Sequence, residues 1–313
     1  MSGASSRGVV FVEALLVLVG AACGGPSASP SASTPAASGV APAERIAFHS
    51  DRGGNTDIYL MNADGTDVMR LTEDPEIDFG PAWSPDGTRI AFHSYRAGCC
   101  AIYMMNPDGS AVSRLTDRAA SPAWSSDGRI AFDTDREGSV DIYVVNADGT
   151  GLKQLTDDPG TDSGADWAPD STRLSFERSE KTTGGLFAAP DIFVMNADGT
   201  GLTRLTEFVG VDTSADWSPD GTKITFASDR DEPRNLEIYV MEADGTDVTR
   251  LTNDRAQDGA PSWSSDGSRI AFESDRDGNL EIYVMNADGS NVTRLTNDPA
   301  DDSTPAWSPT STR

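Results

Sequence analysis

Four kinds of short apolar segment recur in a fixed order along residues 44–313. Each segment has the length of a β-strand, is rich in β-branched and aromatic residues, and ends at turn-forming residues. The first kind is Ile-Ala-Phe or a close variant. The second places Tyr or Phe among aliphatic residues, the third ends in Leu-Thr, usually after Arg, and the fourth contains a tryptophan. Because no sustained helical period interrupts this order, the pattern predicts an all-β protein built from four-stranded repeats.

The second segment of each repeat is apolar on consecutive rather than alternate residues, as in Ile58 to Met61. Such a strand is buried on both faces, so we expect each sheet to pack against a neighbour on either side. The turn that follows is Asn-Ala-Asp-Gly at Asn62 to Gly65 and recurs with small changes in every repeat. Asp-Gly supplies the positive φ that tight hairpins require. We therefore interpret these aspartates as turn formers rather than ligands.

Repeats of about 40–45 residues are typical of β-propellers. All six tryptophans of the chain lie in the fourth segment: Trp83, Trp124, Trp167, Trp217, Trp263 and Trp307. If the Trp segment is strand a, the array opens on strand b at Ile46 and closes on strand a at Trp307. We predict a six-bladed β-propeller of four-stranded antiparallel blades, its ring closed by the C-terminal strand joining the N-terminal blade. A longer array that continues past this point is the alternative.

The segment from Trp263 to Gly289 closely resembles the TolB-type, WD40-like propeller repeat, and the resemblance extends over residues 44–313. It implies a six-bladed propeller that works outside the cytoplasm. TolB proteins carry an additional N-terminal α/β domain, where this chain has a different kind of segment. Their role in an envelope complex, the binding of a peptidoglycan-associated lipoprotein, is therefore not carried over. Fold alone does not fix function.

The N-terminus has the composition of a targeting segment. Residues 1–23 combine Arg7, an apolar run and small residues before Cys23, as in a signal peptide with a lipidation site. Gly20 departs from the lipoprotein pattern, so ordinary secretory cleavage nearby is the alternative. Residues 24–43 are rich in Ser, Pro, Ala and Gly and are predicted to be a flexible tether, followed by the propeller at 44–313.

The formal net charge of −26 disfavours nucleic acid and anionic membranes as partners, because both require basic surfaces. We expect an extracytoplasmic protein, periplasmic or at the cell surface as a lipoprotein and otherwise secreted. Its only contact with the membrane would be an N-terminal lipid anchor at Cys23. A monomer is expected, and the other cysteines, Cys99 and Cys100, would be either free thiols or a strained vicinal disulfide.

Aspartates recur five residues before the tryptophans, on the connection that enters each strand a. We expect them to circle one mouth of the central channel, with two further aspartates directly before a Trp lining it below. A ring of carboxylates can hold a cation or the basic tip of a partner, whereas capping of the local turns is the structural alternative. The residues are Asp78, Asp162, Asp212, Asp258 and Asp302 in the ring, with Ala119 in the sixth place, and Asp166 and Asp216 below it.

Motifs for catalysis are absent: there is no Gly-x-Ser-x-Gly elbow, His-Glu-x-x-His, phosphate loop or dinucleotide fingerprint. The two histidines, His49 and His93, occupy one repeat position that elsewhere holds mostly carboxylates, and we interpret them as packing residues. Oligogalacturonate lyases use a similar propeller whose manganese site is richer in histidine. We therefore expect no catalytic residues, no metal site and no cofactor.

The expected function is that of a non-enzymatic cell-envelope module that binds a protein or peptide partner at the acidic channel mouth. An enzyme or substrate-recruiting accessory acting on carbohydrate or peptide is the first alternative. A calcium-stabilised or glycan-binding propeller is the second, because Asp275 to Asn279 place oxygen ligands at alternate positions. The insertion at Glu177 to Pro190 carries Leu186 and Phe187 and is a further candidate contact with a partner.

Overall fold

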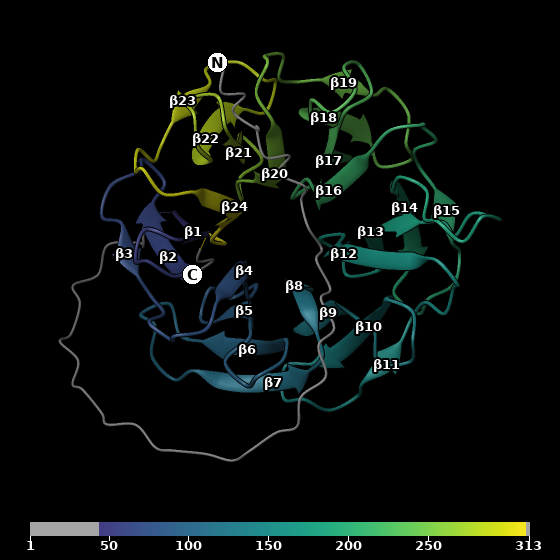
Figure 1. Cartoon of the computed structure of the whole chain (residues 1–313), viewed down its shortest axis with the longest axis horizontal. Helices are drawn as coiled ribbons and strands as arrows, with labels where there is room; N and C mark the ends of the chain where they lie inside the picture. The colour runs from purple at the N-terminus through teal and green to yellow at the C-terminus, as the bar shows by residue number, and fades with distance from the viewer. Residues whose placement is uncertain (1–43, 311–313) are drawn as a thin grey trace, which may run out of the picture. The chain divides into compact units, whose positions relative to one another are not determined.

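The computed structural model describes residues 44–310, which form six four-stranded antiparallel sheets set as blades around a ring (Figure 1). Blade 1 comprises β4 (Asp78–Trp83), β5 (Ile90–Ser94), β6 (Ala101–Met105) and β7 (Ser113–Asp117); blade 2 comprises β8 (Ala120–Trp124), β9 (Arg129–Thr134), β10 (Asp141–Asn146) and β11 (Lys153–Gln154). Blade 3 comprises β12 (Thr161–Trp167), β13 (Arg173–Ser179), β14 (Asp191–Asn196) and β15 (Thr203–Arg204); blade 4 comprises β16 (Asp212–Trp217), β17 (Lys223–Ser228), β18 (Glu237–Glu242) and β19 (Thr249–Arg250). Blade 5 comprises β20 (Asp258–Trp263), β21 (Arg269–Ser274), β22 (Glu281–Asn286) and β23 (Thr293–Arg294); blade 6 comprises β24 (Asp302–Trp307), β1 (Arg45–Ser50), β2 (Asp57–Asn62) and β3 (Met69–Arg70).

Blade 6 is built from both ends of the described chain, as the repeat order predicted. Strand β24 pairs antiparallel with β1, with Ala306 opposite Ala47 and Trp307 opposite Ile46. The Ser308 N–H also donates to the carbonyl of Arg45 at 2.8 Å. The prediction of six four-stranded blades closed by the C-terminal strand is confirmed.

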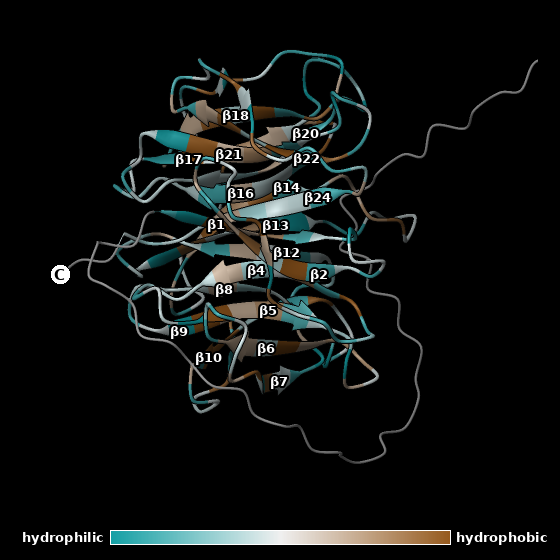
Figure 2. Ribbon diagram, turned by 90° about the vertical axis from the view of Figure 1, so that its left-hand side faces the viewer, coloured by the Kyte–Doolittle hydropathy of each residue, from teal (hydrophilic) through white to brown (hydrophobic). Residues whose placement is uncertain are grey.

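Hydrophobic clusters lie between neighbouring blades rather than within them. One cluster joins Ile58 and Leu60 of blade 6 to Trp83, Phe92 and other residues of blade 1, and five equivalent clusters complete the ring. Hydrophobic residues accordingly concentrate in the strands, and hydrophilic residues occupy many of the connections (Figure 2). Each blade therefore depends on its neighbours to bury its apolar faces.

The innermost strand of every blade contains a β-bulge three residues before the Trp, where the pairing register shifts. Its central residue is left-handed, with φ between 44° and 60°, a conformation that glycine adopts readily and other residues rarely. The six bulge residues are Gly80, Ser121, Gly164, Ser214, Ala260 and Thr304. The bulge turns backbone N–H groups toward the neighbouring blade.

Blade 2 is entered by a shortened connection. Three fewer residues separate Thr116 from Trp124 than separate the same positions in the other five repeats, and the turn from Trp124 to Ile130 is one residue shorter. Strand β7 has five residues, whereas the outer strand of the other blades has two.

Within residues 44–310, no helix has the length and apolar character that a membrane span requires.

Candidate functional site

The five aspartates predicted to ring the channel mouth are almost completely buried, with exposed fractions of 0–1%. Each begins or nearly begins an innermost strand and is paired with an arginine near the end of strand b of its own blade, within the strand at Arg178 and just after it in the other four blades. Arg178, for example, donates from Nε and Nη2 to both oxygens of Asp162 at 2.6 and 2.7 Å. The other pairs are Asp78 with Arg96, Asp212 with Arg230, Asp258 with Arg276 and Asp302 with Arg52.

Each of these arginines is also held over an aromatic pair of its blade. The Arg276 guanidinium lies 5.4 Å from the ring centre of Phe272 and 4.6 Å from that of Tyr283, within cation–π range. Burial raises the pKa of Asp258 to about 6, although hydrogen bonds from Ser274 and Arg276 counteract the rise. The aspartate, the arginine and the aromatic pair form one structural unit that repeats in five blades.

This arrangement corrects the predicted acidic ring. The five carboxylates lie inside the blades and are neutralised by arginines, so they do not present free negative charge at a channel mouth. In the sixth place, Ala119 is buried, and Asp135 of that blade pairs instead with Arg118. Spacing alone located the five positions on one connection but could not reveal that an arginine, itself repeated, reaches back to each.

Asp166 and Asp216 are half-buried on the innermost strands β12 and β16, where they link successive blades. Asp166 accepts a hydrogen bond from the backbone N–H of Trp217 at 2.9 Å, and Asp216 accepts one from Trp263 at 2.8 Å. Burial raises the pKa of Asp166 to about 6, and burial together with the nearby Asp166 carboxylate raises the pKa of Asp216 well above its ordinary value. Whether either residue contacts a partner or cation stays a prediction.

A second set of carboxylates, at the repeat position after the buried Phe of strand b, satisfies the bulges. Glu177 accepts hydrogen bonds from Thr213 Oγ1 at 2.6 Å and from the Ser214 N–H at 2.5 Å, both in the next blade. Glu273 binds Ser303 and the Thr304 N–H in the same way. Burial raises the pKa of Glu177 to about 7 and also raises the pKa of Glu273. This role was not predicted from the sequence, although the six residues share one repeat position.

The two histidines occupy the same repeat position as these carboxylates. His49 Nδ1 lies 2.7 Å from Thr304 Oγ1, and buried His93 packs against Phe79 and Tyr95 with ring centres 4.2 and 5.1 Å away. Burial lowers the pKa of both histidines to about 4. Across the described part of the chain, no group of three or more His, Cys, Asp or Glu residues is placed to hold a metal ion.

Cys99 and Cys100 are free, partly buried thiols on the connection between β5 and β6. Burial raises the pKa of Cys100, so its thiolate is disfavoured. In the insertion, the Thr182 N–H donates to the carbonyl of Leu186, and the side chains of Leu186 and Phe187 are 75% and 53% exposed. Cys23 and the proposed tether lie outside the described residues.

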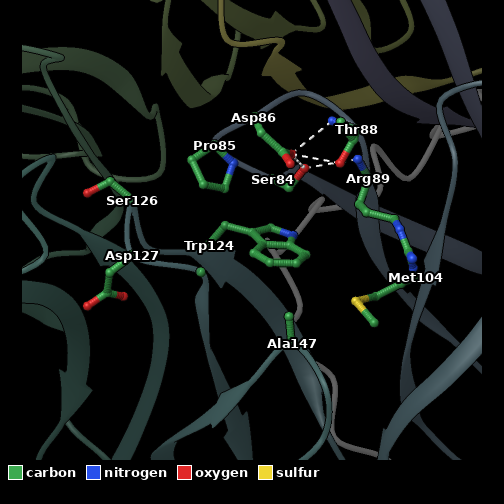
Figure 3. A pocket seen from close by; sticks show the side chains of 11 residues that line it. Ser84, Pro85, Asp86, Thr88, Arg89, Met104, Trp124, Ser126, Asp127 and Ala147 are labelled. Carbon is green, nitrogen blue, oxygen red and sulfur yellow. Dashed lines mark hydrogen bonds between the residues drawn. The ribbon is translucent and has the colours of Figure 1, made fainter.

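A cavity of about 470 Å³ opens between blades 1 and 2, at the end of the blades that carries the turns after the Trp segments. Trp124 lies in its middle, with Arg89 and Met104 on one side and Ser126 and Asp127 on the other (Figure 3). Asp86 and Ala147 also line the cavity. Trp124 is partly exposed, whereas the other five tryptophans are buried. The short spacing before Trp124 is the sequence signal that could have pointed to this interface.

A closed ring of six four-stranded blades, packed through interblade clusters, defines this protein as a six-bladed β-propeller. The family described as "TolB beta propeller domain" matches residues 27–121 and 231–313, and the chain belongs to this family.

Known proteins of two kinds resemble the chain. The Tol-Pal system protein TolB of Anaeromyxobacter dehalogenans is 49% identical over 39 residues, which is 12% of this chain and 9% of that protein. TolB from Acinetobacter baumannii has a similar structure, with a TM-score of 0.74 and 23% identity over 85% of this chain and 66% of the other. An oligogalacturonate lyase in complex with manganese shares the fold more distantly, with a TM-score of 0.55 and 16% identity over 82% of this chain and 74% of the lyase. The chain thus spans about a tenth of the curated relative's length.

Proposed function

We propose that this protein is a non-enzymatic, extracytoplasmic propeller of the cell envelope that binds a protein or peptide partner. Membership of the TolB propeller family carries the proposal, because the curated relative is named as a component of the Tol-Pal system. The pairing of the repeated carboxylates supports a non-enzymatic role. In the described blades, the five aspartates of the predicted ring are paired with arginines. These groups stabilise the ring rather than converge on a substrate.

Binding would then use the surfaces that the blade architecture does not consume. Leu186 and Phe187 are exposed apolar residues on the insertion, and exposed aromatic residues are enriched where proteins meet. The proposed lipid anchor at Cys23 and the tether at 24–43 would hold the propeller near a membrane. Placement outside the cytoplasm, the anchor and the monomeric state are parts of this proposal.

Affinity capture from detergent-solubilised envelope tests the function. Full-length protein should retain at least one envelope protein at near-stoichiometric yield after crosslinking, as measured by quantitative mass spectrometry. The double substitution Leu186→Ser with Phe187→Ser, with Val209→Ser as the matched exposed control, tests whether the insertion contributes. If the full-length protein retains no more than a heat-unfolded sample does, the interaction function is refuted.

A Cys23→Ser variant separates anchoring from binding. Wild-type protein should enter the detergent phase on Triton X-114 partition, and the variant should stay in the aqueous phase while capturing the same partner. Equal aqueous partition of both proteins would argue for secretion instead of lipidation.

A further inference from the structure

The six interfaces between blades provide an internal comparison for the cavity at Trp124. At four of them, the arginine that begins strand b of one blade stacks on the Trp of the next. The ring centre lies 4.5–5.5 Å from the guanidinium carbon, a distance at which cation–π attraction is effective. The pairs are Arg45 on Trp83, Arg129 on Trp167, Arg173 on Trp217 and Arg269 on Trp307.

The interface between blades 4 and 5 lacks this arginine but is closed by other contacts. Lys223 replaces it and pairs with Glu242. Pro219 packs on the following turn, because a Cβ placed on Gly267 would lie 3.2 Å from the proline ring. Trp263 is only 8% exposed there. Loss of the stacked arginine is therefore not enough to open an interface.

The interface between blades 1 and 2 is open at three separate points. The indole of Trp124 is partly exposed, and the equivalent arginine, Arg89, is exposed and extends toward Met104 (Figure 3). No heavy atom lies within 4 Å of a Cβ placed on Gly128. At the equivalent turn of blade 5, by contrast, Pro219 of the preceding blade covers Gly267. A Cβ placed on Gly149 would lie 3.9 Å from the preceding blade, whereas the five equivalent glycines lie at 2.5–2.9 Å.

The shortened connection before β8 is the physical cause of this opening. Three fewer residues span the distance from strand d of blade 1 to strand a of blade 2, and the outer strand β7 is correspondingly extended. Blade 2 therefore meets blade 1 differently from the way in which the other blades meet. The result is a cavity whose volume falls within the range of about 300–1,000 Å³ that is usual for ligand pockets.

We propose that the cavity beside Trp124 binds an arginine side chain presented by a protein or peptide partner, an inference that rests on the proposed function. Trp124 lines the cavity, and no described guanidinium stacks on its indole, whereas four equivalent interfaces place a guanidinium on the tryptophan. Asp86 at the rim accepts hydrogen bonds only from Ser84 and Thr88 among described residues, so its charge has no cationic partner there. Asp127, by contrast, is paired with Arg129, whose guanidinium is already stacked on Trp167.

The net charge of the chain favours the same ligand. With Asp and Glu outnumbering Lys and Arg by 50 to 24, a cationic side chain is attracted to the propeller at long range. Arginine is preferred to lysine because its planar, weakly hydrated guanidinium stacks on an aromatic face while its N–H groups remain free for a carboxylate.

NMR of the six indole N–H groups tests the site on the full chain carrying Cys23→Ser. The probe is N-acetyl-arginine amide, and the matched control is N-acetyl-citrulline amide, which has the same shape without the charge. A Trp124→Phe variant identifies the relevant resonance. That resonance alone should shift saturably, with at least fivefold weaker binding of the citrulline compound.

Three variants make the result specific. Ala147→Leu fills the cavity and should abolish the shift while its melting temperature stays within a few degrees of wild type. Asp86→Asn should weaken binding severalfold, whereas Asp220→Asn, at the same turn of blade 4, should not. Arg89→Ala tests whether the chain's own arginine occupies the site, and binding should be unchanged or tighter.

The proposal is overturned if no indole resonance shifts saturably in wild type, if all six move together, or if citrulline binds equally well. A shift seen only with Arg89→Ala also overturns it, because the occupant is then intramolecular. Undiminished envelope capture by Ala147→Leu would refute the pocket as the docking point and leave the interaction function intact. Failure of capture by wild type, with the Trp124 shift present, would refute the function and leave the arginine site.

Discussion

At the scale of single residues, two groups of carboxylates in the blades differ in their partners. Asp162 and its equivalents face an arginine of their own blade, whereas Glu177 and its equivalents accept hydrogen bonds from the backbone of the next blade. The first group stiffens a blade, and the second joins blades. Leaving a buried charged or polar group without its partner costs free energy. Removing a partner from the first group should therefore destabilise a single blade, whereas removing one from the second should weaken the packing between two blades.

The Asp162–Arg178 pair should be strongly coupled. Asp162→Asn leaves the buried guanidinium with only the more exposed Asp158 carboxylate, 3.6 Å away, and should reduce the free energy of unfolding by about 3 kcal/mol. Arg178→Met should cost a similar amount, but the double variant should lose clearly less than the sum, which urea denaturation of all four proteins measures. Additive losses would contradict the pairing.

Glu177 should give the protein a pH dependence opposite to that of a salt-bridged carboxylate. Its pKa is about 7 in the folded protein against an ordinary value of 4.5, so the folded state holds the proton more tightly. The contribution of Glu177 to the free energy of unfolding is therefore greatest below about pH 4.5 and is lost as pH rises through 7. Glu177→Gln, which stays neutral and can still accept the hydrogen bonds, should remove roughly 1–3 kcal/mol of that loss.

Thermal unfolding of wild type and Glu177→Gln at pH 5 and pH 8 measures the difference. Glu180→Gln, on the exposed insertion immediately after β13, is the matched control and should follow wild type. Parallel pH profiles for wild type and Glu177→Gln would contradict the assignment.

At the scale of elements, the left-handed bulge is the feature that each innermost strand shares. Glycine fills it in two blades, and Ser, Ala or Thr fill it in four, so the conformation is imposed by the surrounding sheet rather than by residue choice. The Glu177 and Glu273 carboxylates that hold the bulge N–H groups account for part of that constraint.

Gly164 is the bulge where a side chain should be tolerated least. Gly164→Ala would keep a φ of 59° and bring its Cβ to 3.0 Å from Glu177 Oε1, so it should cost at least about 1 kcal/mol of stability by urea denaturation. Gly54→Ala is the control, because its φ of 85° is also left-handed but nothing lies within 4 Å of its Cβ. An equal loss in both variants would leave no role for the Glu177 contact.

The strands could be predicted from sequence because apolar periodicity and turn chemistry repeat six times. The bulges could not, since Ser121, Ala260 and Thr304 carry no local signal for a left-handed residue. The acidic ring was mispredicted for a related reason: Asp78 and Arg96 are 18 residues apart, and only the register of β4 on β5 brings them together. The cavity at Trp124 follows from the shortened connection before β8, which becomes evident only when the repeats are compared with one another.

At the scale of the whole molecule, stability depends on ring closure, because every hydrophobic cluster is shared by two blades. A chain ending at residue 300 lacks β24 and exposes the edge of β1 together with the cluster that contains Trp307. It should lose its cooperative melting transition and associate, as measured by calorimetry and size-exclusion chromatography.

A circular permutant supplies the control for that truncation. A chain that starts at Val209, which is 97% exposed, and ends at Phe208 would join residue 310 to residue 44 by a short linker. Blade 6 would then be continuous in sequence, and the melting temperature of the permutant should stay within a few degrees of wild type. Cooperative, monomeric melting of the truncated chain would show that closure is dispensable.

The pairing of β24 with β1 also sets the order in which the protein can be completed during synthesis. Strands β1 to β3 leave the ribosome first, yet their partner is made some 250 residues later. At about 5–20 residues per second, the first edge waits more than ten seconds for its neighbour. Until then the nascent chain is an open arc of blades with unpaired strand edges, so any chaperone that binds it acts before the ring exists rather than against it.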